Sequence, residues 1–490
     1  MNQVLKENIK ENKNLKVVPI TITLISAGFF CMLNETVLNM ALKTLMQQFN
    51  ISANTVQWLS TGYMLIMGIS IPLSAFLTKK FTTRQLFLTS VAIFLLGTII
   101  SSIAPIFSIL LAGRLIQAVG TGVLIPNIIN TLLIIYPIRS RGKILGVFNL
   151  VMFCAPAIGP TLSGLVLQFL NWRWLFLVII PFSFISFIAG YLYMQNVTKL
   201  ENPSLDIISV LLSTIGFGGF IYGVNNIGVS STAMTIPIII GCVALFAFVL
   251  RQFHMDNPML DIRLFKYPMF TIGTILIIIM HMVNFATMLI LPMFLEGALG
   301  LTAFGAGLVM LPGGFINGIV SPISGHLYDK FGPKTLILPG FIISALVFLI
   351  FSFTISSTIT IPLIIALHCL SLLAVGLINT PTQTNSLNQL SLESTPHGTA
   401  IMNTLQQIAG AFGTSLFVAI MSASQKDYLN SVGNINDPSA QTLSLVYGVH
   451  HVFIIQVCVL IFAVILASFL KHKPNRAKEC TIRNSTVIEK

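Results

Sequence analysis

Charged residues are scarce in this chain of 490 residues, where Asp, Glu, Lys and Arg together make up 8% of the sequence. A soluble domain carries about 25% charged residues. Acidic residues are the rarer sign, with 14 Asp and Glu against 26 Lys and Arg, while 55% of the chain is hydrophobic. This balance excludes a soluble globular protein and indicates an all-α integral membrane protein.

Enzyme motifs and a disulfide framework are missing too. The chain has no H-E-x-x-H, no G-x-S-x-G and no Walker A motif, so metal-dependent hydrolysis, acyl transfer and ATP-driven pumping have no support. Five of the six cysteines lie in apolar stretches and Cys480 lies in a basic tail, so we expect neither disulfides nor a metal or other cofactor. The alternative of a membrane sensor would need a soluble signalling domain, for which the tail is too short.

Apolar stretches of about twenty residues, long enough to cross a hydrocarbon core of roughly 30 Å, recur along the chain. The first runs past the length of a signal sequence and lacks a convincing cleavage site, so we expect it to be retained. The longest breaks, 251–269 and 424–444, are expected to hold a short interfacial helix and a mobile polar loop. Fourteen transmembrane helices are predicted, beginning near residues 17, 56, 86, 107, 143, 173, 206, 235, 270, 304, 335, 359, 398 and 447.

The Lys and Arg residues sort by side of the membrane. A net charge of +12 would suit a nucleic-acid partner in a soluble protein, but all except four of the 26 Lys and Arg residues fall in loops of one side. The exceptions are Lys43, Arg173 and Lys426 on the other side and Arg114 within a span. The positive-inside rule then places both termini in the cytoplasm. We expect a multi-pass protein of a bacterial cell membrane, surrounded by membrane lipids rather than bound to nucleic acid.

An internal repeat organises the helices. At an offset of 250 residues, the segment Ile71–Arg84 aligns without gaps on Ser321–Lys334, with Pro, Ser, Leu, Lys and Phe coinciding. The two copies lie eight helices apart, which predicts two six-helix halves plus two inserted helices. Parallel repeats of this kind are typical of secondary transporters with a site at the midplane between the halves. The predicted parts are a cytoplasmic segment 1–16, a first half 17–195, inserted helices 196–252, a second half 253–470 and a basic tail 471–490.

The repeated loop resembles a signature of the major facilitator superfamily, G-x-L-x-D-R-x-G-R-R/K. The second copy, Gly325-His-Leu-Tyr-Asp-Lys-Phe-Gly-Pro-Lys334, fits it well, and the resemblance implies a conformational latch at Gly325, Asp329 and Gly332. The first copy departs from the signature, with Ala75 for Gly, Lys79 for the acid and Thr82 for Gly.

Further motifs resemble the fourteen-helix drug:proton antiporter family. They are Leu33–Lys43 (where Asn34, followed by Glu35, replaces the usual acid), Arg114–Gly122, Ala155–Gly164, Trp172–Phe176 and Pro258–Phe265. The resemblance implies a proton-coupled antiporter, working as a monomer, that exports amphipathic or cationic drugs by alternating access. Export of an endogenous lipid or metabolite is the alternative, because an apolar cavity suits both.

Glu35 is the leading candidate for proton binding. An ionisable group at bilayer depth is costly unless it is paired or faces water, so its presence suggests a function. The i, i+4 rule places Cys31, Glu35 and Asn39 on one helix face, which we expect to line the central cavity. The alternative is a structural acid with a permanent partner.

Arg114 is the candidate partner of Glu35. It shares a helix face with Gln117 and Thr121, and the resembled family assigns this Arg to proton coupling. A switchable Glu35–Arg114 pair would link substrate to proton, whereas a fixed buried pair would only set helix packing. Glu296, near the outer end of its helix, is a second proton site or a solvated interfacial residue, with neither favoured. His281 and His368 are expected to be hydrogen-bonded packing residues.

Two further rows of small and polar residues are candidate conformational or cavity sites. In the helix expected to begin near residue 143, the rows Ala155–Gly159–Ser163 and Pro156–Pro160–Gly164 predict a close helix approach and a bend. Asn403 and Gln407 lie on a polar face that lines the cavity or packs in the core. The predicted cavity residues are therefore Asn34, Asn39, Gln117, Asn403 and Gln407, in a wall built mostly of Phe and Met.

Overall fold

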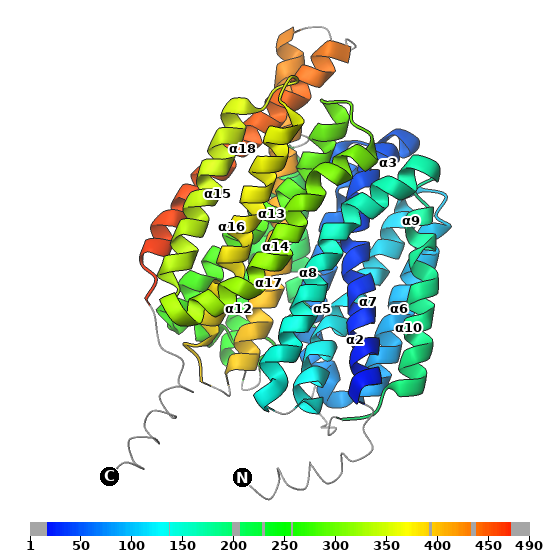
Figure 1. Cartoon of the computed structure of the whole chain (residues 1–490), viewed down its shortest axis with the longest axis vertical. Coiled ribbons are helices and arrows are strands. Elements are labelled where there is room, and N and C mark those ends of the chain that lie inside the picture. The colour runs from blue at the N-terminus through cyan, green and yellow to red at the C-terminus, as the bar shows by residue number, and fades with distance from the viewer. Residues whose placement is uncertain are drawn as a thin grey trace, which may run out of the picture.

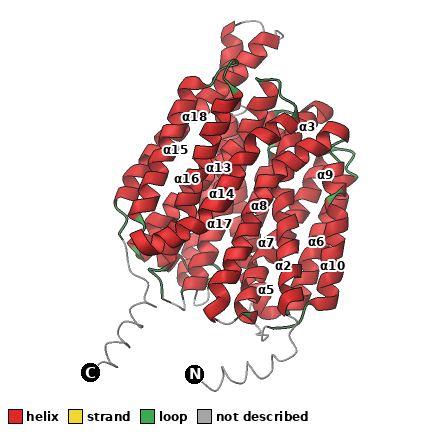
Figure 2. Ribbon diagram, in the orientation of Figure 1, coloured by secondary structure: helices red, strands yellow, loops and turns green. Residues whose placement is uncertain are grey.

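The computed structural model describes residues 17–136, 138–197, 206–227, 231–255, 258–391, 394–432 and 438–471. These residues form a bundle of roughly parallel helices joined by short loops (Figures 1 and 2). Fourteen helices of the described chain are long and apolar enough to cross a membrane, as the sequence predicts.

The first half contains α2 (Val17–Val37), η2 (Leu38–Ala41), α3 (Leu42–Phe49), α4 (Ala53–Val56), α5 (Trp58–Lys80), α6 (Thr83–Ser102), α7 (Phe107–Ile135), α8 (Ile138–Phe169), α9 (Trp174–Leu177) and α10 (Ile179–Tyr193). The inserted pair is α11 (Ile207–Asn225) and α12 (Ser231–His254). The second half contains η3 (Ile262–Lys266), α13 (Pro268–Gly297), α14 (Ala303–Phe331), α15 (Lys334–Thr354), α16 (Ile361–Leu387), α17 (Thr395–Val432) and α18 (Pro438–Ser468).

The helix packing repeats between the halves, as the sequence repeat predicts. In the first half α6 packs on α7, α5 on α7, and α2 on α8 and α10. The second half has the matching pairs α15 on α16, α14 on α16, and α13 on α17 and α18. The halves meet along two seams, α8 against α14 and α5 against α17. Because α8 of the first half corresponds to α17 of the second, and α5 to α14, the pseudo-twofold relation converts each seam into the other. The fold is therefore a pseudo-twofold pair of six-helix halves.

The inserted helices lie beside one of these seams. α11 packs on α12 and also contacts both α5 and α17, whereas α12 contacts η3. The described surface of α12 is largely apolar and exposed, with Val243 and Phe246 each more than 60% exposed. This exposure is expected for a helix that faces lipid rather than protein.

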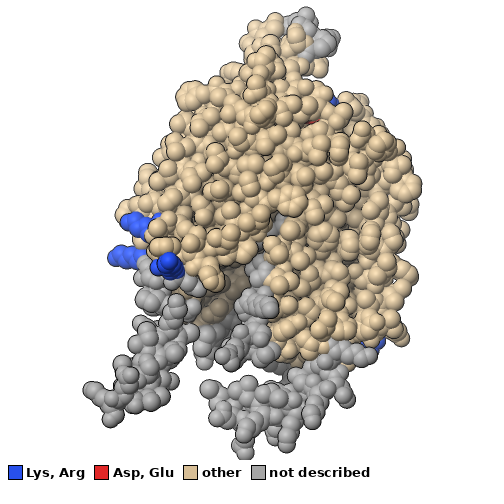
Figure 3. All heavy atoms as spheres, in the orientation of Figure 1, with Lys and Arg blue, Asp and Glu red and all other residues tan. Residues whose placement is uncertain are grey.

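Both described ends of the chain lie at one end of the bundle, because an even number of spans separates Val17 from Lys471. On the face shown in Figure 3, the described Lys and Arg side chains gather mainly at this lower end. Most of the remaining surface in that view carries no charge, which suits a lipid-facing belt.

The outer break around 424–444 differs from the expected polar loop. α17 continues to Val432 and α18 begins at Pro438, so two helical ends project beyond the rest of the bundle (orange, top of Figure 1). Tyr428 and Tyr447 contact each other there, with ring centroids 5.3 Å apart, and this contact supports the helical pairing. At the other long break, η3 is the short helix that the sequence predicts.

Candidate substrate cavity

A cavity of about 470 Å³ lies between the two halves. Along α16 its lining runs from His368 to Thr384, close to the end of that helix at Leu387. The cavity therefore extends from the middle of the bundle toward the end where α2 begins. The surface in Figure 3 is hollowed between the halves at this lower end.

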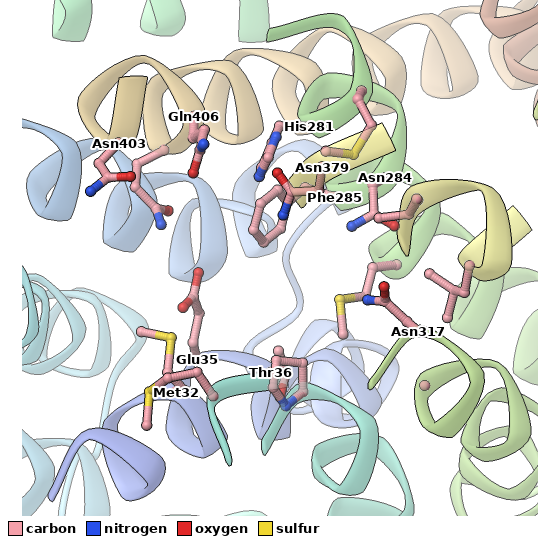
Figure 4. A pocket seen from close by; sticks show the side chains of 18 of the residues that line it. Met32, Glu35, Thr36, His281, Asn284, Phe285, Asn317, Asn379, Asn403 and Gln406 are labelled. Atoms are coloured by element: carbon pink, nitrogen blue, oxygen red, sulfur yellow. The ribbon is translucent and has the colours of Figure 1, made fainter. Parts of the chain in front are cut away.

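Glu35 points into this cavity from α2, beside Met32 and Thr36 (Figure 4). The residue is only 6% exposed, and its Oε1 has no hydrogen-bond partner among the described residues. No Asp, Lys or Arg and no second Glu belongs to the described lining. A carboxyl group in this position is available to a proton or to a cation that enters the cavity.

The polar face predicted on α2 is interrupted just beyond Glu35. The helix changes to the 3₁₀ segment η2 at Leu38, which winds with three residues per turn rather than 3.6. Asn39 is thereby turned away from the cavity, and its Oδ1 accepts a hydrogen bond from Ser60 Oγ at 3.1 Å. Asn39 packs against α5 instead of lining the cavity.

Arg114 on α7 is fully buried and makes no ion pair in the part of the chain that the structure describes. Its guanidinium donates to Leu59 O at 3.3 Å and to Asn34 O at 3.1 Å, and lies 4.3 Å over the ring of Tyr63. The predicted direct pairing of Arg114 with Glu35 is absent from this conformation, because the guanidinium is held by main-chain carbonyls. Arg114 instead fixes the backbone of the residue that precedes Glu35.

Gln117 supports the Arg114 side chain. Its Oε1 accepts from Arg114 at 3.1 Å, and its Nε2 donates to Thr98 Oγ1 at 2.8 Å. Both bonds are buried, so Gln117, like Asn34, lies outside the lining of the cavity in this conformation. A helical face in the sequence shows that such residues share a side, but not whether that side meets water or a neighbouring helix.

The opposite end of the cavity is closed by contacts between the halves. Lys43 Nζ donates to the main-chain oxygen of Glu296 at 2.7 Å, and Thr61 and Thr414 join their hydroxyl groups at 2.8 Å. Glu296 is buried, at 6% exposed, and lies outside the cavity lining. Its position at this closure differs from the position of Glu35, which faces the cavity.

The small residues of α8 meet a different helix on each side. A Cβ atom added at Gly159 would lie 2.2 Å from Thr36 Oγ1, and one at Gly164 would lie 2.4 Å from Ala303 O of α14. Ala155 is fully buried, while Pro156 and Pro160 lie inside the helix and line the cavity. The close approach predicted for this helix therefore joins α8 to α2 and to the other half.

The repeated loops join corresponding helices. Gly332 ends α14 with a φ of 79°, a backbone conformation that favours glycine, and a Cβ added at Gly325 would lie 3.3 Å from Thr380 Cγ2 of α16. The side chain of Asp329 lies outside the described residues, so its predicted role as a latch stays a prediction.

The second half supplies most polar groups of the cavity. Asn403 and Gln407 belong to its lining, together with Gln406. Figure 4 shows Asn403 and Gln406 on the same side of the cavity. His281 and His368, expected in the packing, are also in the lining; His281 Nδ1 lies 3.0 Å from Ile277 O of its own helix. Sequence reasoning missed other residues, although a polar face on each helix was the available signal. They are Asn284, Asn317, Ser371, Asn379, Thr380 and Gln383.

Two pseudo-symmetric helical halves around a central polar cavity define a membrane transporter. The chain belongs to the Major Facilitator Superfamily, whose family model matches residues 24–414. It is 49% identical over 474 residues to the lincomycin resistance protein LmrB of Bacillus subtilis (strain 168), covering 96% of this chain and 99% of that protein. It is 25% identical over 401 residues to the multidrug resistance protein B homolog of Mycobacterium tuberculosis (strain ATCC 25618 / H37Rv), covering 81% and 74%.

Solved structures share the fold at low sequence identity. A bacterial homolog of the human lysosomal transporter Spinster, in an inward-facing and unoccupied conformation, matches with a TM-score of 0.67 and 14% identity, covering 91% of this chain and 95% of that chain. A D-xylose-proton symporter matches with a TM-score of 0.65 and 14% identity, covering 93% and 98%. These matches support the fold of a multi-pass membrane transporter.

Proposed function

We propose that the protein is a proton-coupled antiporter that exports amphipathic, cationic small molecules, including drugs, across the bacterial cell membrane. The sequence relatives named for lincomycin and multidrug resistance support the class of substrate. The excess of Lys and Arg on one side supports a cytoplasmic location for both ends of the chain. In that orientation the cavity extends toward the cytoplasm and is closed toward the outside.

The main support for this proposal is the position of Glu35 in the cavity lining. It is the one carboxyl group of the described lining, and its Oε1 makes no hydrogen bond to the described residues. A carboxyl group in a cavity between alternating halves exchanges a proton for a cationic substrate, because each ligand weakens binding of the other at the same group. In our account, a cytoplasmic substrate displaces the proton, and an external proton displaces the substrate. Antiport follows from this competition.

Arg114 acts as a positioning residue in this account. Its bond to Asn34 O holds the peptide next to Glu35, and Gln117 holds the guanidinium in turn. The free Nη2 of Arg114 has no hydrogen-bond partner among the described residues, so the guanidinium keeps a donor for another conformation. We propose that this donor approaches Glu35 when the halves rearrange.

Alternating access requires the outer contacts to break. The Lys43 bond to Glu296 O and the Thr61–Thr414 pair join different halves, so both are lost when the cavity opens outward. We propose that α8 serves as the seam for this movement, and that the segment with Gly325, Asp329 and Gly332, at the end of α14, closes the opposite end. Asn403 and Gln407 contact substrate, and Glu296 belongs to the outer closure.

Transport in proteoliposomes tests the proposal. With an imposed pH gradient, we expect the wild type to move lincomycin and Glu35→Gln to lose gradient-driven transport while keeping the folded state. Glu296→Gln is a matched control, since it removes a buried acid but keeps the main-chain oxygen that Lys43 contacts. Full gradient-driven transport by Glu35→Gln would refute the assignment. Gradient-driven movement of a lipid but of no amine would favour an endogenous substrate.

A further inference from the structure

The two walls of the cavity differ in chemistry. All seven Asn and Gln residues of the described lining come from the second half: Asn284, Asn317, Asn379, Gln383, Asn403, Gln406 and Gln407. The first half contributes an apolar wall with two polar exceptions, Glu35 and Thr36: its other residues are Met32, Met67, Ile71, Ile125, Pro126, Ile129, Phe148, Met152, Pro156 and Pro160. A molecule in the cavity therefore meets an acid and apolar groups on one side, and on the other side all the amides together with two His residues and apolar residues such as Met288.

Several of these amides lack partners within the protein. Asn379 Oδ1, Gln406 Nε2 and Gln407 Oε1 are buried and make no hydrogen bond to the described residues. Buried polar groups in folded proteins normally have partners, so unpartnered donors and acceptors on residues that line a cavity point to a ligand, or to water that a ligand replaces, once these side chains turn toward it. Because both donors and acceptors are free, hydroxyl and amide groups, which do both, fit this wall.

Large aromatic side chains are few in the described lining of the 470 Å³ cavity, which contains Phe148 and Phe285 but no Trp or Tyr. The expectation of a wall built mostly of Phe and Met is wrong for Phe. Flat aromatic cations are bound best between aromatic faces, which stack on them and attract their charge. The lining gives such cations little to stack on, and favours ligands that make hydrogen bonds.

We propose that the preferred substrates are amphipathic amines that carry several hydroxyl or amide groups on one side. The amino group lies at Glu35, and the apolar body lies against the Met and Ile residues of the first half. The hydroxyl or amide side lies against the seven Asn and Gln residues of the second half, which we call the amide wall. This inference rests on the proposed export function and adds the substrate class to it. Figure 4 shows Glu35 on one side of the cavity, with Asn403, Gln406 and Asn379 on the opposite side.

A site built to hydrogen-bond a hydroxyl group discriminates strongly against an analogue that lacks it, because its own polar groups are then left unpaired. The same site tolerates changes in the shape of the substrate's apolar part, since the flexible Met side chains of the first half adapt readily to different shapes. Selectivity is therefore expected for the polar side of the substrate, and tolerance for its apolar side.

Two labelled permanent cations separate these contributions: hexyltrimethylammonium and hexyldimethylglucaminium. They share the tail and the charge and differ in the polyol chain. We expect the purified wild-type protein in proteoliposomes to take up hexyldimethylglucaminium with a kcat/KM about tenfold or more above that for hexyltrimethylammonium under one pH gradient. Equal values for the two cations would overturn the substrate class.

Asn379→Leu tests the amide wall directly. Its Oδ1 has no partner in the described protein, so the substitution breaks no hydrogen bond of that atom and is compatible with folding. We expect it to lower kcat/KM for the glucaminium and to leave that for hexyltrimethylammonium within about twofold, so that the preference shrinks. Met293→Leu, an apolar exchange in α13 outside the lining, is the matched control and should keep the preference.

The possible results separate the two proposals. Gradient-driven transport of hexyltrimethylammonium with no preference for the glucaminium contradicts the substrate class and leaves the export function standing. Gradient-driven transport of neither cation, nor of lincomycin, contradicts the export function itself. An equal loss for both cations in Asn379→Leu, with Met293→Leu unaffected, would show a general role for Asn379 and overturn its assignment to polyol recognition.

Discussion

Arg114 Nη1 donates a hydrogen bond of 3.1 Å to the main-chain oxygen of Asn34, the residue before Glu35. The buried cation on α7 thus holds the peptide that carries the cavity acid, rather than the acid itself. This arrangement separates two tasks that the sequence suggests for one ion pair. The helix is held by main-chain bonds, and Glu35 Oε1 makes no hydrogen bond to the described residues.

Arg114→Leu is expected to lower the free energy of unfolding by an amount on the order of 3 kcal/mol. The change removes the hydrogen bonds that the guanidinium donates to Asn34 O, Leu59 O and Gln117 Oε1, and it leaves the buried Gln117 Oε1 without its donor, which costs about 1–3 kcal/mol. Thermal unfolding of the purified protein measures the loss. Arg114→Lys should recover part of the stability, because an ammonium group reaches some of the same acceptors. Equal stability of the wild type and Arg114→Leu would contradict this assignment.

Gly159→Ala is expected to weaken packing of α8 on α2 by about 1–3 kcal/mol, the usual range for overpacking. The added methyl group would lie 2.2 Å from Thr36 Oγ1, so one of the two helices must shift. Transport should fall with stability, since Thr36 follows Glu35. Thr36→Ala removes the atom in conflict and should restore part of both in the double variant.

The matched control is Gly318→Ala in α14, where an added Cβ atom meets nothing within 4 Å. It should leave transport unchanged and stabilise the helix by up to about 1 kcal/mol, as alanine usually does in a helix interior. If the two alanine variants behave alike, the contact between Gly159 and Thr36 is not the cause of the effect.

Asn225→Leu is expected to loosen the inserted helices from the first half. Asn225, at the end of α11, hydrogen-bonds Gln57 and donates to Asn54 O at 3.1 Å, while Asn54 Oδ1 accepts from Ser422 of α17 at 2.8 Å. The leucine leaves buried groups of Gln57 and Asn54 unpaired, at about 1–3 kcal/mol. Asn226→Leu alters the next residue, whose side chain, among the described residues, hydrogen-bonds within its own helix turn at Tyr222 O. Comparable melting temperatures for the two variants would argue against this junction.

Asp206 should make stability depend on pH in acid. Hydrogen bonds from the Arg251 side chain, at 2.8 and 2.9 Å, lower the pKa of Asp206 from 3.8 to about 2. A carboxyl group whose pKa is lower in the folded state stabilises the fold above its unfolded pKa. That contribution is therefore complete above about pH 4 and is lost as the pH falls toward about 2. The stability of Asp206→Asn should decline less steeply across this interval, as thermal unfolding at a series of pH values will show.

The sequence predicts the helices well because a membrane imposes their length and polarity. The predicted starts at 17, 107, 206 and 335 lie within one residue of the starts of α2, α7, α11 and α15, and the repeat predicts the two six-helix halves. The outer ends of α17 and α18 were harder to predict, because polar residues form helices there outside the hydrocarbon region, where hydropathy carries no signal.

The cavity is less predictable from sequence than the helices. Asn39 and Gln117 lie on polar faces that meet neighbouring helices, through Ser60 and Thr98, and no pattern along one helix distinguishes these partners from a cavity. The 3₁₀ segment after Val37 also breaks the periodicity on which the α2 prediction rests. Glu35 could be predicted to face the cavity because a lone acid in an apolar helix is costly unless it is paired or faces water, whichever helices surround it.

Substrate-induced proton release measures directly whether substrate and proton compete for Glu35. Purified protein in weakly buffered detergent solution, with a pH-sensitive dye, should release protons when lincomycin is added, because the bound cation displaces the proton. We predict that Glu35→Gln releases none, although Glu296→Gln releases as many as the wild type. Undiminished proton release by Glu35→Gln would contradict the account.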